Sequence, residues 1–160
     1  MLAPSKPRPS LFSLPSAHTA ALLVPAALLA GAIGSQLVGG LVPCEMCIWQ
    51  RWPHVAALVL AVLAFPIRRA RAALVAFAAL AVAVSGGIGV YHAGVEQGIF
   101  DGITTCTATA SGLDAIMNAD LVRCDAVQWE FIGISMAGWN AIISLSAALF
   151  IALGVIKGRA

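Results

Sequence analysis

Four long apolar stretches constrain the fold of this chain more than any other feature of its sequence. Each is long enough for a helix of about 17 to 25 residues, the length that crosses the hydrocarbon layer of a bilayer. A soluble domain would need a polar exterior, yet only 10% of the 160 residues are charged and 61% are hydrophobic. The sequence therefore predicts an all-α integral membrane protein, a bundle of four transmembrane helices at about 19–42, 48–66, 72–92 and 133–156.

Prolines and charges guide the interpretation of the chain ends. Residues 1–16, which contain four prolines, are predicted to form a flexible cytoplasmic tail, and residues 17–160 a single membrane domain. A cleaved signal peptide is the alternative for the first apolar stretch, because Lys6 and Arg8 precede it. The stretch is longer than the roughly 7 to 15 apolar residues of a signal peptide, which favours a retained helix.

The basic residues predict the orientation of the helices. Apart from Arg51 and Arg123, they fall in the N-terminal tail, the connection between the second and third spans, and the C-terminal tail. The positive-inside rule places these three segments, and so both termini, in the cytoplasm. Two outer loops then face the other side, a short one before the second span and a long one at about 93–132. In a bacterial inner membrane this side is the periplasm.

Two spans carry small side chains at intervals of four residues. These are Ala27, Gly31, Ser35 and Gly39 on the first span, and Ser144, Ala148 and Ala152 on the last. Such ladders let helix backbones approach each other closely in lipid. We therefore expect both faces to pack against neighbouring helices.

All four cysteines lie in the predicted outer loops, Cys44 and Cys47 in the short loop and Cys106 and Cys124 in the long one. Disulfides persist in an oxidising compartment, so two disulfides are expected. One interpretation is that they only staple the loops. This explains Cys44 and Cys47 poorly, because so small a ring removes little entropy from the unfolded chain.

The Cys-x-x-Cys spacing is instead typical of a labile, exchangeable disulfide. Pro43 precedes the pair and the second span follows at once, so the pair opens a helix, whose N-terminal partial charge stabilises a thiolate. Arg51 lies one turn after Cys47 on the same helical face, where its guanidinium can stabilise that thiolate and hydrogen-bond a bound acceptor. The alternative for Arg51 is contact with lipid headgroups.

A metal site is the main rival use of the cysteines. The second close pair of a typical zinc site is missing, and no histidine directly follows Cys47 as in a haem-attachment motif, so we predict no metal. His92, at the outer end of the third span, is interpreted as a proton-handling or headgroup-contacting residue. His54 follows Pro53 and is expected to bond a backbone carbonyl that this proline leaves free.

Two cysteine pairs on one side of a membrane predict thiol-disulfide exchange between them. Exchange moves electrons without disposing of them, and the sequence has no haem, flavin or nucleotide motif. The electron acceptor is therefore expected to be small and lipid-soluble and to enter between helices beside Cys47. A membrane quinone meets both conditions.

Together these motifs resemble the DsbB (disulfide bond formation protein B) family of bacterial inner-membrane proteins. The resemblance rests on Pro43-Cys44-x-x-Cys47 with Arg51, on Tyr91-His92, on Cys106, and on Cys124-Asp125-x-x-Gln128-Trp129-x-Phe131-x-Gly133. Two departures accompany it. Gln50 stands where an acidic residue is familiar, and the segment between the two loop cysteines is short.

The resemblance implies an enzyme, a protein-disulfide oxidoreductase that reoxidises a periplasmic DsbA-type thioredoxin-fold protein and passes the electrons to ubiquinone or menaquinone. It implies that Cys106 forms the mixed disulfide with this partner and that Cys124 is released to attack Cys44. Cys47 then faces the quinone. Besides the partner and the quinone, the protein is expected to contact the lipid bilayer, and no nucleic acid.

Arg51, His92 and Cys47 are thus the expected quinone-binding residues, and the four cysteines the expected catalytic ones. Two other interpretations stay open. One is a structural or transport bundle with stapled loops, and the other is a reductase that runs electrons outward from a quinol. The sequence does not determine the direction, because redox potentials depend on local environment rather than on a motif.

Overall fold

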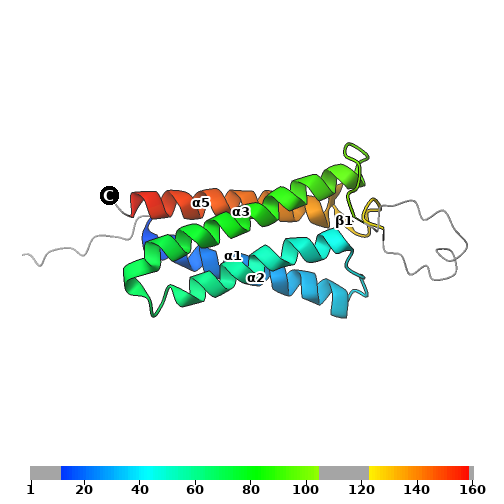
Figure 1. Cartoon of the computed structure of the whole chain (residues 1–160). Helices are drawn as coiled ribbons and strands as arrows, with labels where there is room; N and C mark the ends of the chain where they lie inside the picture. Colours follow the sequence, from blue (N-terminus) through cyan, green and yellow to red (C-terminus); the bar gives the residue numbers. More distant parts are fainter. Residues whose placement is uncertain (1–11, 105–122, 159–160) are drawn as a thin grey trace, which may run out of the picture.

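The computed structural model describes residues 12–104 and 123–158, and four long helices run along this part of the chain (Figure 1). They are α1 (Leu14–Leu37), α2 (Glu45–Leu63), α3 (Arg71–Glu96) and α5 (Met136–Lys157), with a short 3-10 helix, η1 (Arg68–Ala70), between α2 and α3. All four helices are long and apolar enough to cross a membrane, with η1 and α3 counted together as one span. The predicted fold class, a membrane protein with a four-helix bundle, is confirmed.

Helix boundaries follow capping side chains that the apolar pattern does not reveal. α1 begins before the predicted residue 19 because the Ser13 side chain caps it, accepting a hydrogen bond from the Ser16 amide at 3.4 Å. Its first three residues are therefore helical, although the sequence assigns them to the flexible tail. The N-cap of α2 is Cys44, whose sulfur accepts a hydrogen bond from the Cys47 amide at 3.2 Å. The second span thus starts at the cysteine motif itself.

Small side chains fill most of the interior between the helices. Alanines from all four helices dominate the buried core, with Val75, Val82 and Ile151 as the larger members. α3 and α5 approach each other closely, because a Cβ built on Gly89 would lie 2.9 Å from the carbonyl oxygen of Ala137. Since only glycine permits such an approach, α3 and α5 form a tight seam in the bundle.

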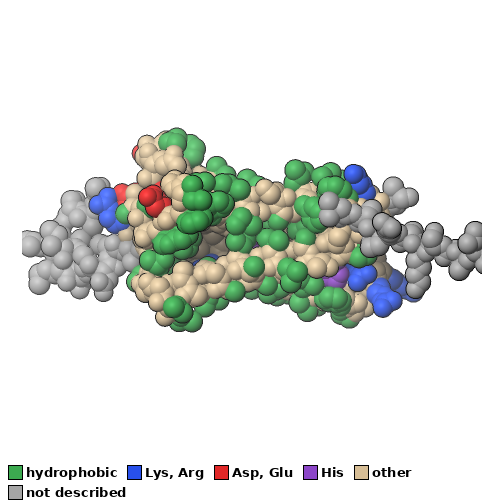
Figure 2. Space-filling model, turned by 180° about the vertical axis from the view of Figure 1, so that it is seen from behind, with side chains coloured by type: hydrophobic (Ala, Val, Ile, Leu, Met, Phe, Trp, Pro, Cys, Tyr) green, Lys and Arg blue, Asp and Glu red, His purple; other side chains and the backbone are tan. Residues whose placement is uncertain are grey.

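The outside of the bundle has the character of a lipid-facing surface. Figure 2 shows hydrophobic side chains along the middle of the molecule and charged side chains gathered toward its ends. Large apolar side chains such as Leu23, Phe77 and Leu149 are 63%, 59% and 62% exposed. An apolar surface this large is stable when hydrocarbon covers it, which agrees with a protein that spans a membrane.

A short hairpin, which the sequence did not predict, leads into α5. β1 (Glu130–Phe131) pairs antiparallel with β2 (Ile134–Ser135), and Ile132 and Gly133 form the turn with φ values of 56° and 72°. Two successive positive φ angles are typical of a two-residue hairpin turn. The Trp139 indole donates a hydrogen bond to the β1 backbone at 3.1 Å. The hairpin is thereby fastened to the first turn of α5.

Candidate functional site

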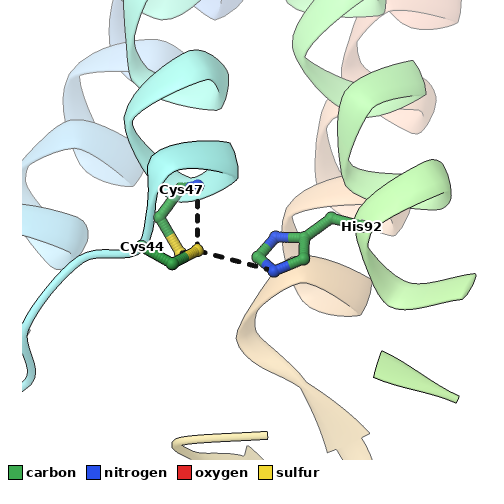
Figure 3. Close-up of side chains that lie close together, drawn as sticks. All are labelled: Cys44, Cys47 and His92. Atoms are coloured by element: carbon green, nitrogen blue, oxygen red, sulfur yellow. Dashed lines mark hydrogen bonds between the residues drawn. The ribbon is translucent and has the colours of Figure 1, made fainter. Parts of the chain in front are cut away.

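The two cysteines of the Cys-x-x-Cys motif meet at the N-terminus of α2. Cys44 is the N-cap and Cys47 lies in the first turn, which places their sulfurs 2.9 Å apart (Figure 3). The Cys44 thiol donates a hydrogen bond to Cys47 Sγ and accepts one from the Cys47 amide. Cys44 is buried and Cys47 is partly exposed. The pair is therefore positioned to form one disulfide, with Cys47 as its more accessible member.

These contacts favour the protonated form of Cys44. Its hydrogen bond to Cys47 and its burial both raise the pKa of the Cys44 thiol far above the usual range. When the pair is reduced, Cys44 therefore keeps its proton at neutral pH.

His92 and Cys124 complete a cluster around Cys44. His92 lies near the end of α3, and its Nε2 is 3.6 Å from Cys44 Sγ (Figure 3). Cys124 is fully buried in the same small core as Cys44. It receives a hydrogen bond from Thr104 at Sγ, at 3.3 Å, and its backbone is hydrogen-bonded to His92. The fold thus brings a cysteine of the long loop to the Cys-x-x-Cys pair.

Arg51 reaches across to α1 from the second turn of α2. Its guanidinium donates hydrogen bonds to Gln36 Oε1 at 2.9 Å and to the carbonyl of Ala32 at 3.2 Å. Both acceptors belong to the protein, so the guanidinium is held between two helices. This geometry favours a role in a site over simple contact with lipid headgroups.

A cavity of about 570 Å³ lies beside Cys47 and Arg51. One of its walls is the predicted ladder of small side chains, with Ala27, Gly31 and Ser35 on α1 and Gly39 just beyond its end. This corrects the expectation that the ladder packs closely against another helix. A Cβ built on Gly31 would meet none of the described atoms within 4 Å. The small side chains here create space, because the buried residues of α1 lie in its first half and its second half stands away from the core.

The polar lining of the cavity is concentrated around the cysteines. Besides many apolar residues, the lining includes Cys44, Cys47, Gln50, Arg51, His92 and Glu96, with His54, Arg123, Gln128 and Asn140 as further polar members. A mostly apolar cavity with a few convergent polar groups is the usual form of a small-molecule site. The arrangement suits an apolar compound that carries hydrogen-bond acceptors.

A chain of polar side chains runs from His92 into the interior of the bundle. Gln50 Nε2 lies 2.8 Å from His92 Nδ1, and Gln50 Oε1 accepts a hydrogen bond from Asn140 at 2.7 Å. Asn140 also contacts His54 Nε2 at 3.0 Å and donates to Ser85 Oγ at 3.2 Å. Polar groups at this depth are costly unless they are hydrogen-bonded, and these largely satisfy one another.

His54 belongs to this network, which corrects its predicted role. Its Nε2 contacts the Asn140 amide and the Ser85 hydroxyl, the latter at 2.9 Å. We expected the ring to bond a backbone carbonyl left free by Pro53. Instead, side chains from α3 and α5 form hydrogen bonds with Nε2 of the ring, because the three helices pack closely at this level.

Arg123, an exception to the sorting of basic residues, forms an ion pair with Asp125. Its Nε and Nη2 donate to the two carboxylate oxygens at 2.9 and 2.6 Å. The guanidinium lowers the pKa of Asp125, and the carboxylate raises the pKa of Arg123. The local partner explains a basic residue on the side of the bundle that carries the cysteines.

Comparison with known proteins identifies the family of this arrangement. The sequence profile described as "Disulfide bond formation protein DsbB" matches residues 15–154. This chain belongs to the DsbB family. A Disulfide bond formation protein B of Xanthomonas oryzae pv. oryzae is 31% identical to it over 147 residues, which cover 84% of this chain and 86% of the relative. A Disulfide bond formation protein B of Methylococcus capsulatus is 34% identical over 159 residues, which cover 86% of this chain and 93% of the relative. No solved structure gives a significant match.

The family membership makes this DsbB protein a membrane disulfide oxidoreductase that acts in disulfide bond formation. Of the site residues expected from the sequence, the structure brings together Cys44, Cys47, Cys124 and His92, and places Arg51 at the adjoining cavity. Cys106 lies outside the described residues.

Sequence reasoning did not assign Gln50, Glu96 or Asn140 to the candidate site, although it noted Gln50 as a departure from the family pattern. Glu96 follows His92 by one helical turn, and its Oε1 lies 3.8 Å from His92 Nε2. Asn140 is an amide inside an apolar span, a pattern that marks functional or packing positions in membrane helices. That pattern was the available signal, but it does not reveal which helix the side chain contacts.

The same cluster has a geometry that a soft metal ion could use. One ligand atom from each of Cys44, Cys47 and His92 lies within 4.8 Å of the others. Only an unprotonated Nε2 can bind a metal, so the position of the proton on His92 decides whether the ring acts as a ligand or as a hydrogen-bond donor.

Proposed function

We propose that this DsbB protein reoxidises a periplasmic DsbA-type thioredoxin-fold protein and passes the electrons to a membrane quinone, ubiquinone or menaquinone. The observation that carries the proposal is the position of Cys47. Its sulfur lies 2.9 Å from Cys44 and lines an apolar cavity, while Cys124 packs in the same core as Cys44. A path of sulfur atoms therefore leads from the long loop to a cavity inside the bundle.

The proposed electron path contains two exchanges. A thiolate of the partner attacks Cys106 in a Cys106–Cys124 disulfide, which forms a mixed disulfide and releases Cys124 as a thiolate. Cys124 then attacks Cys44, so that a Cys124–Cys44 bond forms, the Cys44–Cys47 bond breaks and Cys47 leaves as a thiolate. The burial of Cys124 beside Cys44 supports the second exchange.

The cavity residues fit a quinone as the final acceptor. A bound quinone supplies two-electron oxidation at Cys47. Arg51, held in place by α1, offers a charge-assisted hydrogen bond to an acceptor oxygen, and the N-terminus of α2 stabilises a thiolate at Cys47. His92 lies beside Cys44, with Nε2 3.6 Å from its sulfur, and also lines the cavity.

We also propose that the protein lies in a bacterial inner membrane with both termini in the cytoplasm. The start of α1, the η1 turn and the end of α5 lie at one end of the bundle, and the N-terminus of α2, which carries Cys44 and Cys47, lies at the other (Figure 1). Arg68, Arg69 and Lys157 belong to the first end, which supports a cytoplasmic position for it. Membrane-impermeant thiol reagents applied to intact spheroplasts test this orientation.

The absorbance of a soluble quinone tests the electron path. Purified protein is mixed with the quinone and a reduced thioredoxin-fold dithiol protein, beside a Cys47→Ser control. We expect quinone to be consumed only when Cys47 is present. If a folded preparation consumes none with several partners and quinones, the stapled-bundle interpretation replaces this one.

A second variant separates the two exchanges. In Cys106→Ser the partner is expected to stay reduced, whereas chemically reduced Cys44 and Cys47 still react with quinone. Normal oxidation of the partner by this variant contradicts the proposed path.

A further inference from the structure

Two backbone carbonyls fix the orientation of the amides that lie behind His92. The carbonyl of Met46 lies 3.3 Å from one end of the Gln50 side chain, and the carbonyl of Ser85 lies 3.2 Å from one end of the Asn140 side chain. A carbonyl only accepts hydrogen bonds, so in each case the near end is the NH2 group. Exchanging nitrogen and oxygen in either side chain would bring two acceptors together.

These orientations determine the direction of the remaining hydrogen bonds. Asn140 donates to Gln50 Oε1 at 2.7 Å, and the second N–H of Gln50 donates to His92 Nδ1 at 2.8 Å. A neutral imidazole that accepts at Nδ1 carries its proton at Nε2. The resulting Nε2–H faces three acceptors: the Cys124 backbone, with which the ring is hydrogen-bonded, Cys44 Sγ at 3.6 Å and Glu96 Oε1 at 3.8 Å. The hydrogen-bond chain therefore points from α5 toward the redox-active sulfur.

We propose that Gln50 and Asn140 are positioning residues of the DsbB site, which together hold the His92 proton on Nε2 so that His92 donates a hydrogen bond to Cys44. This inference rests on the proposed function, because it gives the hydrogen bond a part in thiol-disulfide exchange. None of the three side chains needs to change its protonation state in the course of the reaction.

The hydrogen bond acts when Cys44 leaves the Cys124–Cys44 disulfide that the second exchange forms. The thiolate of Cys106, freed when the partner closes its own disulfide, attacks Cys124 Sγ, so that the Cys106–Cys124 bond forms again, the Cys124–Cys44 bond breaks, and its electron pair remains on Cys44 Sγ. In this buried position the charge is poorly solvated, and a preorganised donor 3.6 Å away stabilises it as it develops. Without such a donor, release of Cys44 as a thiolate is slower.

The amide at position 50 is essential to this arrangement. An ionised carboxylate has no N–H and would accept a hydrogen bond from His92, which moves a proton onto Nδ1. The amide also opposes metal binding by Cys44, Cys47 and His92, because a protonated Nε2 has no lone pair to offer.

Nitrogen-15 NMR of the imidazole rings tests the position of the proton in reduced protein without quinone or partner. The chain contains three histidines, and the signals that vanish in His92→Gln belong to His92. We expect wild-type His92 to be unprotonated at Nδ1 and protonated at Nε2, and Gln50→Glu to be protonated at Nδ1. Gln97→Glu, a change at an exposed glutamine just beyond α3, is the matched control and keeps the wild-type pattern.

Two results overturn the assignment: a wild-type His92 with its proton on Nδ1, or a Gln50→Glu variant whose Nδ1 stays unprotonated. The wild-type spectrum is decisive by itself if the variant does not fold. It is also independent of quinone reduction, so failure of the proposed function and failure of this inference are separate outcomes.

Steady-state kinetics tests whether the position of the proton matters for the reaction. Gln50→Glu and Asn140→Leu are expected to lower kcat for partner-dependent quinone reduction about tenfold at saturating quinone, where a change in quinone affinity caused by their place in the cavity lining does not limit the rate. Near-UV circular dichroism confirms that each variant is folded. A wild-type kcat in a folded Gln50→Glu variant with a protonated Nδ1 contradicts the positioning role.

Discussion

At the scale of single residues, Arg51 connects the cavity to the helix that bounds it. It is held by Gln36 and Ala32 of α1 and lies one turn below Cys47. We predict that Arg51→Ala raises the apparent KM for quinone at least tenfold, because a hydrogen bond from a charged donor contributes about 1.5 to 3 kcal/mol. Quinone titrations measure this, with Arg68→Ala at the opposite end of the bundle as control. An unchanged KM would assign Arg51 to headgroup contact.

Cys44 provides a residue-scale prediction about pH. A raised pKa keeps the thiol protonated, and only the thiolate is alkylated. In the reduced protein we therefore predict that alkylation of Cys44 begins at a higher pH than that of an ordinary thiol, whose pKa is about 8.5. Cys47→Ala removes the hydrogen bond that stabilises the thiol form, so the onset moves to lower pH. Peptide mass spectrometry after timed alkylation measures this onset pH in the wild type and in the variant. A higher onset pH in the variant contradicts the assigned direction of the hydrogen bond.

At the scale of elements, the seam between α3 and α5 depends on the absence of side chains. A methyl group on Gly89 would lie 2.9 Å from the Ala137 carbonyl oxygen and 3.1 Å from the Ala141 amide nitrogen, and neither backbone atom can move aside as a side-chain end can. We predict that Gly89→Ala destabilises the bundle by about 2 kcal/mol. Thermal unfolding in detergent measures this.

Gly87, two residues earlier in α3, provides the matched control. A Cβ there meets none of the described atoms within 4 Å. Gly87→Ala is therefore expected to be neutral, or to stabilise the helix by up to about 1 kcal/mol, since alanine has the higher helix propensity. Equal melting temperatures for the two variants are incompatible with a close seam at Gly89.

At the scale of the whole molecule, the cavity exists because α1 packs with its first half and stands away with its second. We predict that Gly31→Leu, which extends a side chain from this wall, raises the KM for quinone at least tenfold and leaves the exchange between partner and cysteines intact. Gly34→Leu, on the same helix but outside the cavity lining, is the control. Parallel assays of quinone reduction and of single-turnover partner oxidation distinguish the two steps. Equal KM values for both variants would remove α1 from the acceptor site.

Much of this architecture could be predicted from the sequence. Hydropathy alone predicts the four spans, and the Cys-x-x-Cys motif with Arg51 predicts the polar end of the cavity. The ladder of small side chains at the α1 wall was misinterpreted. Small side chains either let a neighbouring helix pack closely or leave a cavity, and only the position of that helix distinguishes the two outcomes. The contact between Gln50 and Asn140 joins residues 90 apart in sequence, and no local pattern encodes it. The hairpin turn was missed because Ile132, a β-branched residue, rarely adopts a positive φ.

The half-detached α1 has a consequence for how such an enzyme can diversify. The described cysteines and His92 belong to α2, its N-cap, α3 and the segment before the hairpin, whereas α1 supplies one wall of the cavity that we propose for the acceptor. Substitutions that reshape this wall leave the cysteines, His92 and its supporting amides untouched. If the cavity holds a lipid-soluble electron acceptor as we propose, a lineage that changes this acceptor can adapt through a single helix, while the cysteine exchange is inherited unchanged.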